Sequence, residues 1–315
     1  MKINIIDKVN DGLLGFVVGD ALGVPIEFTT RESHKKEPLK DMIGFGSHNV
    51  SEGTWSDDSS MTIATMDSIR ECKEINYDNI MQKFCDWLFK EKYTATDIVF
   101  DIGNTTLIAL NSYYKNKTLA IDSGMKDEYS NGNGSLMRML PIVYYLYCKD
   151  FDDAKKVQII NDYSSLTHGH EVSKLGCKIY YDFLEEILNG LSKIEAYKKL
   201  KNKNYSNFYS QESISKYKRV LDGSLEFLSE EYIKSSGYVI DTLEASIWSV
   251  LNTADYEEAV IKAVNLGGDT DTIGAITGSI AGNIYGANSI PKRWISKIKK
   301  LNYIQEIALE FAKII

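Results

Sequence analysis

Two acidic turns, far apart in the sequence, carry the side chains best suited to do chemistry. The first is Ser56-Asp57-Asp58, and the second is Asp269-Thr270-Asp271-Thr272. Their carboxylates and hydroxyl groups are hard oxygen ligands, which Mg²⁺ or Mn²⁺ prefers and a soft metal does not. The alternative is that each Asp only caps a helix N-terminus. Because both turns are rich in Asp and precede helices beside glycine-rich backbone, we interpret them as a site for two divalent cations.

Two glycine stripes indicate the helices that position these turns. One follows the second acidic turn and the other lies near the N-terminus, and their members are Gly274, Gly278, Gly282 and Gly286, and Gly12, Gly15, Gly19 and Gly23. Glycine inside a helix costs about 1 kcal/mol relative to alanine, so a repeated glycine needs a compensating close contact. We expect both helices at the centre of the molecule, packed against each other. For the stripe that follows the second acidic turn, the alternative is a membrane span. Its apolar run is too short to cross a bilayer and reaches Asn283.

The remaining pattern predicts an all-α fold, a single helical bundle. Apolar residues recur at intervals of three and four, and no segment alternates as a strand does. Expected helices cover residues 7–22, 53–74, 78–90, 96–114, a segment entered near Pro141, 152–167, 171–189, 237–248, 256–265, 269–286 and a region from 291 to 315. Residues 24–53 should be irregular, and residues 190–236 should form a solvated helical hairpin. No linker-like stretch divides the chain, so we expect one domain, residues 1–315.

Composition excludes some classes of partner and location. A net charge of −8 and a pI near 5.2 argue against a nucleic-acid-binding surface. The N-terminus lacks the apolar core of a signal peptide. The four cysteines are dispersed without a C-x-x-C pair, as reduced thiols are. We expect a cytoplasmic monomer that binds neither nucleic acid nor membrane.

Seven stretches of the chain resemble the ADP-ribosylglycohydrolase family, which includes the dinitrogenase reductase-activating glycohydrolase and the ADP-ribosylarginine hydrolases. They are residues 15–28, 53–62, 101–104, 131–138, 167–168, 237–242 and 267–272, in the family's order and across almost the whole chain. The resemblance implies an all-α fold with a dinuclear Mg²⁺ or Mn²⁺ centre in a cleft that binds ADP-ribose. The chain departs from the family at Ser56 and Ser59, where threonine is usual. A serine hydroxyl can still coordinate a metal.

The resemblance also implies roles for single residues at the metal centre. The first ion would be held by Ser56, Asp57, Asp58 and Asp271, and the second by Asp269, Asp271 and Thr272. Asp271 would then bridge the two ions. Glu27 and Asp101 are the expected acid or base groups, and Asp58 belongs to the catalytic set as well as to the metal set.

Further positions match the family's substrate-binding residues. They are Asn104, the glycine-rich loop Asn133, Gly134, Ser135 and Met137, and also His168 and Tyr238. The loop would present backbone N–H groups to the diphosphate, as a helix entry does for an anion. His168 and Tyr238 would lie near the distal ribose and the adenine. Taken alone, the loop is more often a simple turn, His168 a loop histidine and Tyr238 a core aromatic.

The activity implied is hydrolysis at the ribose C1″, which releases ADP-ribose from a modified protein side chain. Arginine-, serine-linked and O-acetylated ADP-ribose are family substrates, and Asp101-Ile-Gly-Asn104 favours arginine. One alternative is a two-metal phosphohydrolase that cleaves a nucleotide diphosphate, although the His–Asp pairs common in helical phosphohydrolases are absent from a chain with four histidines. Another is a catalytically inactive ADP-ribose binder or structural relative, against which the intact acid set argues.

Overall fold

The computed structural model describes residues 4–315, and this part of the chain is all-α, as predicted. It contains sixteen α-helices, six short 3₁₀ turns and no strand. The helices are α1 Ile5–Gly23, α2 Arg31–Lys36, α3 Asp57–Cys72, α4 Tyr77–Lys90, α5 Asn104–Asn116, α6 Leu140–Tyr147, α7 Asp153–Ser165, α8 Glu171–Leu188, α9 Lys193–Leu200, α10 Gln211–Lys216, α11 Lys218–Leu221, α12 Val239–Leu251, α13 Tyr256–Val264, α14 Thr270–Tyr285, α15 Lys292–Ile295 and α16 Leu301–Ala312.

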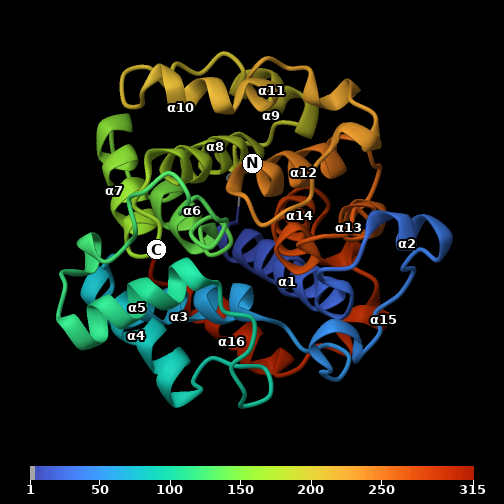
Figure 1. Cartoon of the computed structure of the whole chain (residues 1–315), viewed down its shortest axis with the longest axis horizontal. Helices are drawn as coiled ribbons and strands as arrows, with labels where there is room; N and C mark the ends of the chain where they lie inside the picture. The colour runs from blue at the N-terminus through green and yellow to red at the C-terminus, as the bar shows by residue number, and fades with distance from the viewer. Residues whose placement is uncertain (1–3) are drawn as a thin grey trace.

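Helices α1 and α14 pack against each other at the centre of the molecule (Figure 1). A Cβ atom built on Gly15 or Gly19 would collide with the backbone carbonyl of Gly278 or Gly274, and the reverse substitutions would collide in the same way. The predicted glycine contact is therefore confirmed. Close packing of two backbones gains dispersion energy that offsets the low helix propensity of glycine.

The ends of the two stripes differ from the prediction. Gly12 does not face the partner backbone, because a Cβ there would meet Tyr144 and the side chain of Asn283. Gly286 lies outside the helix: its φ of +80° breaks the helical path, and its N–H bonds to the carbonyl of Gly282. A left-handed φ suits glycine, so this residue ends α14 and packs no second backbone.

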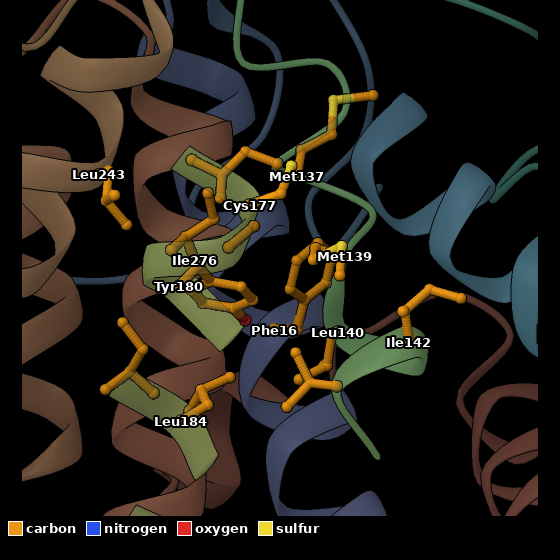
Figure 2. Packing of buried hydrophobic residues seen from close by; sticks show 14 of the residues in the cluster. Phe16, Met137, Met139, Leu140, Ile142, Cys177, Tyr180, Leu184, Leu243 and Ile276 are labelled. Atoms are coloured by element: carbon orange, nitrogen blue, oxygen red, sulfur yellow. The ribbon is translucent and has the colours of Figure 1, made fainter. Parts of the chain in front are cut away.

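Helices from the middle of the chain cover the central pair. Figure 2 shows Phe16 of α1 and Ile276 of α14 near Tyr180 of α8 and Leu140 of α6. All four side chains are buried. The segment Ile5–Ile26 is long and apolar enough to cross a membrane, yet 89% of its window is buried inside the protein. It serves here as a core helix.

Three predicted elements were wrong in extent or character. Residues 24–53 are not irregular throughout, because they contain α2 and the 3₁₀ turns Val24–Ile26 and Gly46–His48. The expected helix over 96–114 begins only at Asn104, because Asp97 and Asp101 have left-handed φ values of 59° and 56° and Gly103 is the N-cap. Residues 190–236 do form short helices, but they are not simply solvated. Four of their tyrosines are buried and join the hydrophobic core: Tyr197, Tyr205, Tyr209 and Tyr217.

Candidate active site

A pocket of about 270 Å³ lies where α3, α5 and α14 begin. It brings together eleven of the residues that the sequence analysis singled out: Glu27, Asp57, Asp58, Asp101, Asn104, Asn133, Gly134, Met137, His168, Asp269 and Thr272. No lysine or arginine is among its lining residues, which all fall within the described range 4–315. The pocket therefore concentrates carboxylates without a basic side chain to balance them.

The first acidic turn is held by the start of α3 and by α1. Ser56 is the N-cap of α3, and its Oγ accepts from the N–H of Asp58 at 3.3 Å. Asp20 of α1 accepts from the N–H of Ser56 at 2.9 Å and from that of Ser59 at 3.1 Å. Burial raises the pKa of Asp20 to about 7. Asp20 orients this turn, and the sequence analysis missed it although an acid within a glycine stripe is unusual.

Two glycines in left-handed conformations precede the second acidic turn and position it. Gly267 and Gly268 have φ values of 71° and 77°, which suit glycine. The N–H of Gly268 donates to the carbonyl of Thr29 at 2.9 Å, and the N–H of Phe28 donates to the carbonyl of Gly268 at 2.7 Å. This pairing places the segment that contains Glu27 beside Asp269.

Hydrogen bonds join the two turns. Thr272 Oγ1 donates to Asp58 Oδ2 at 3.2 Å, and Asn133 Nδ2 donates to Asp269 Oδ2 at 3.1 Å. The side chain of Asp269 makes no capping bond, although the residue stands at the N-cap position of α14. The interpretation of this Asp as a simple helix cap is therefore wrong.

Several carboxylate oxygens in this cluster are buried without any hydrogen-bond partner. They are Asp58 Oδ1, Asp269 Oδ1 and both oxygens of Asp271. Burial, and then repulsion from neighbouring acids, raises the pKa of Asp57, of Asp58 and of Asp271 well above the usual range, and burial also raises the pKa of Asp269. Unpaired buried carboxylates are costly unless a cation is bound to them. An all-oxygen donor set of this kind fits Mg²⁺ or Mn²⁺.

Asp271 takes part in two groups of carboxylates whose oxygens are close enough to share an ion. In one group Glu27, Asp269 and Asp271, and in the other Asp57, Asp101 and Asp271, each offer an oxygen within 4.8 Å of the others. Asp271 is buried and does not line the pocket itself. Glu27 and Asp101 thus stand directly beside the predicted metal ligands.

Glu27 and Asp101 occupy irregular backbone on the pocket wall. Burial, followed by the charges of Asp101 and Asp269, raises the pKa of Glu27 to about 11. Asp101 was predicted within a helix, but it lies in the loop before α5, and its φ is in the left-handed region. Non-glycine residues in that region are often found at functional sites. Asn104, the first residue of α5, lines the same wall.

The glycine-rich loop offers fewer free amides than predicted. The N–H of Asn133 donates to the carbonyl of Gly237 at 3.0 Å, and that of Met137 donates to the carbonyl of Asn133 at 2.9 Å. Within residues 4–315, the N–H groups of Gly134, Ser135 and Leu136 have no hydrogen-bond acceptor. The side chain of Ser135 points away from the pocket, where its Oγ accepts from Ser164 at 3.0 Å. Only its backbone can serve an anion.

His168 lines the pocket as a neutral imidazole. Burial and the charge of Arg138 lower its pKa to about 3. Thr167 Oγ1 accepts from Arg138 Nη2 at 2.8 Å and lies 2.8 Å from His168 Nδ1. Because Arg138 can only donate, the Thr167 proton is available to Nδ1, and we infer that Nε2 carries the ring proton. His168 is then a hydrogen-bond donor to whatever enters the pocket.

Tyr238 does not line the pocket, and six residues that do line it were not predicted as site residues: Phe28, Gly103, Thr105, Thr106, Gly132 and Gly237. Tyr238 is the N-cap residue of α12 and is 36% exposed, so it is not the core aromatic of the alternative interpretation. Phe28 lines the pocket and is 71% exposed. His48 contacts the carboxylate of Glu27 through Nε2. Nothing in local spacing indicates this contact, because it joins residues 21 positions apart.

Comparisons with known proteins agree over the whole chain. The sequence profile of the ADP-ribosylglycohydrolase family matches residues 1–315. An ADP-ribosylarginine hydrolase Tri1 of Serratia proteamaculans (strain 568) is 31% identical, over 96% of this chain and 78% of the relative. The ADP-ribosyl-(dinitrogen reductase) glycohydrolase of Rhodospirillum rubrum is 27% identical, over 93% of this chain and 90% of that relative. A solved structure of an ADP-ribosylglycohydrolase-related protein complex has a TM-score of 0.81 and 27% identity, over 99% of both chains.

Proposed function

The chain is an enzyme of the ADP-ribosylglycohydrolase family, and we propose that it removes ADP-ribose from modified arginine side chains with the help of two divalent cations. The reaction is hydrolysis of the bond at the ribose C1″. The similarity to an ADP-ribosylarginine hydrolase supports arginine as the linkage. The position of Asp101 on the pocket wall also suits a guanidine leaving group, since a carboxylate attracts its positive charge.

The observation that carries the proposal is the set of buried carboxylate oxygens without partners. We assign Mg²⁺ or Mn²⁺ to them: Ser56, Asp57, Asp58 and Asp271 would hold one ion, and Asp269, Asp271 and Thr272 would hold the other. The membership of Asp271 in both carboxylate groups supports its role as the bridge. When bound, such ions orient the ribose hydroxyls and lower the pKa of water. The acids of the pocket then need no lysine or arginine to balance them.

The protein's own groups divide the remaining work. Glu27 is the proton acceptor for the attacking water, and cations bound beside it would bring its raised pKa back toward the range of an ionised base. His168 donates from Nε2 to a ribose hydroxyl. The free amides of Gly134, Ser135 and Leu136 receive the diphosphate. Asn104, Asn133 and Met137 contact the bound ribose and diphosphate from the surrounding walls, and Tyr238 packs beside the adenine at the rim.

Defined substrates and their products test this proposal. The protein with Mn²⁺ is incubated with one peptide carrying arginine-linked ADP-ribose and another carrying the serine linkage. Release of free ADP-ribose from the arginine peptide, abolished by a chelator and restored by Mn²⁺, is expected. Release of AMP instead would indicate the two-metal phosphohydrolase. Binding of ADP-ribose without turnover of either peptide would indicate an inactive ADP-ribose binder.

Three expectations from composition stay predictions. We propose that residues 1–315 form one domain, that the protein is a monomer and that it works in the cytoplasm without binding nucleic acid or membrane. Size-exclusion chromatography with light scattering tests the second of these, because a monomer has a mass of 35.6 kDa.

A further inference from the structure

Two adjacent residues of the loop that follows α2 contact Glu27. Ser47 Oγ donates to the backbone carbonyl of Glu27 at 2.5 Å, and His48 Nε2 contacts Glu27 Oε2. The side chain of His48 is 15% exposed and that of Glu27 is 4% exposed. One loop therefore holds both the backbone and the carboxyl group of the same acid.

The backbone of this loop is constrained so that it can approach Glu27. A Cβ on Gly46 would collide with the carbonyl of Pro25, and Gly46 has a φ of +63°. Phe45 and Asn49 also adopt left-handed φ values, of 67° and 52°. Backbone strain of this kind persists only where surrounding contacts enforce it. The loop is thus a built support for the segment that carries Glu27.

The carboxyl group of Glu27 needs such a support because its other neighbours repel it. Asp101 and Asp269 both act on it with like charge. Among the residues described, His48 is the one side chain with an N–H group in contact with this carboxylate. The imidazole is itself flanked by Phe28 and Phe100, with ring centroids 6.1 and 5.1 Å away. These rings restrict the rotation of His48 and so fix the direction of its Nε2.

We propose that His48 is a positioning residue, which holds the Glu27 carboxylate against the repulsion of Asp101 and Asp269 and so keeps it aimed at the acidic cluster. The inference rests on the proposed function, because it gives Glu27 the role of proton acceptor. His48 itself does not line the pocket. Its loss misplaces the base without emptying the ADP-ribose pocket.

Kinetics of matched variants test the role. In His48→Ala, kcat should fall about 10-fold or more, as the loss of an orienting partner typically does. KM for the ADP-ribosyl peptide should change only a few-fold. His48→Gln should recover most of kcat, because its side-chain amide can still donate to Glu27. The control is His34→Gln, which removes another buried histidine, one that contacts Thr29 outside the pocket. It should leave kcat unchanged.

A cycle with Glu27 separates positioning from general loss of structure. In a Glu27→Ala background, the change His48→Ala should reduce kcat little further, because the two residues act as one unit. Equal kcat in His48→Ala and in the unaltered protein would overturn the inference. So would equal damage in His48→Ala and His48→Gln, or fully additive effects with Glu27→Ala.

A readout without catalysis keeps this inference separate from the proposed function. The chain has four histidines, so their ring nitrogens can be resolved by ¹⁵N NMR. Glu27→Ala should shift the Nε2 resonance of His48 more than the ring nitrogens of the other three. An unmoved His48 resonance would contradict the contact even if the enzyme is active. If the unaltered protein releases no ADP-ribose while the resonance shifts, the proposed function fails and the Glu27–His48 contact stands.

Discussion

The glycine contact between α1 and α14 and the acidic pocket involve the same pair of helices, but they differ in their side chains. Along the contact, side chains are absent and the two backbones touch at Gly15, Gly19, Gly274 and Gly278. In the pocket, charged side chains gather and several of their oxygens lack partners. At the glycine contact, the absence of side chains lets the two backbones pack closely, and this packing stabilises the fold. The chemistry comes from acids that the protein alone does not neutralise.

The first region fixes the geometry of the second. α1 carries Asp20 and is followed, after one 3₁₀ turn, by Glu27, while the first turn of α14 carries Asp271. At the junction, Thr270 Oγ1 donates to the carbonyl of Gly23 at 2.8 Å. A rigid backbone contact therefore sets how far the acids of one helix lie from those of the other. Disturbing the contact should lower stability, whereas disturbing the acids should lower activity.

Removing the shared acid should have the largest effect. Asp271→Asn should lower kcat/KM by about 10³-fold or more, because a neutral amide cannot bridge two cations that supply several kcal/mol of transition-state stabilisation. Calorimetry should show that neither ion binds. Asp57→Asn, the matched control in the other turn, should weaken mainly one ion. Two-ion binding unchanged in Asp271→Asn would remove it from the bridge.

Filling the glycine contact should be the largest effect on stability. Gly278→Ala places a Cβ against the carbonyl of Gly15 and should cost about 3 kcal/mol of unfolding free energy. Gly103→Ala is the control: its Cβ would have no neighbour within 4 Å, and its φ is −64°. It should cost less than about 1 kcal/mol. Urea denaturation measures both, and similar losses would show that the stripe is not a tight interface.

Glu27 should separate chemistry from binding. Glu27→Gln should lower kcat by about 10²-fold, the usual worth of a general base, while ADP-ribose affinity stays within a few-fold. Asp101→Asn should lower rate and affinity together, because Asp101 lies on the wall near the leaving group. Rapid-quench kinetics and equilibrium binding distinguish the two patterns. Full turnover by Glu27→Gln would transfer the base role to Asp101.

The pH dependence of thermal stability should show the smallest effect. In the cation-free protein, Asp20 and Glu27 have pKa values near 7 and 11, against ordinary values of 3.8 and 4.5. From about pH 4 upward the folded state therefore holds more protons than the unfolded state, so stability falls as pH rises through 7. Scanning calorimetry in a chelator should show this fall. The gain in Tm from Mg²⁺ should be larger at pH 7.5 than at pH 5.5, and a gain independent of pH would contradict it.

Local spacing predicted the two features that depend on it. The glycine repeat indicated the α1–α14 contact, and the paired Asp-rich turns indicated the carboxylate cluster. Both follow because neighbours in a helix or a turn have fixed relative positions. Local patterns predicted the fold class and the acidic turns with Asp57, Asp58, Asp269 and Thr272. The family resemblance supplied the other predicted pocket residues, which are Glu27, Asp101, Asn104, Asn133, Gly134, Met137 and His168.

Features decided by tertiary contacts escaped prediction. Asp101 was wrongly predicted within a helix. The left-handed conformations of Asp97 and Asp101 depend on the folded surroundings, which local sequence does not show. His48 reaches Glu27 through a loop with no periodic pattern. The amides of Asn133 and Met137 form bonds that the loop's sequence does not indicate. The buried tyrosines of 190–236 lie in a stretch whose composition suggested solvent exposure.

Calorimetric titration of the unaltered protein with Mn²⁺ tests whether the partnerless oxygens of Asp58, Asp269 and Asp271 form a divalent cation site. We expect two ions to bind per chain. Proton release should grow as pH falls, since the raised pKa values of Asp58 and Asp271 mean that bound protons must leave. Absence of binding at millimolar Mn²⁺, together with chelator-resistant release of ADP-ribose, would contradict the cation site.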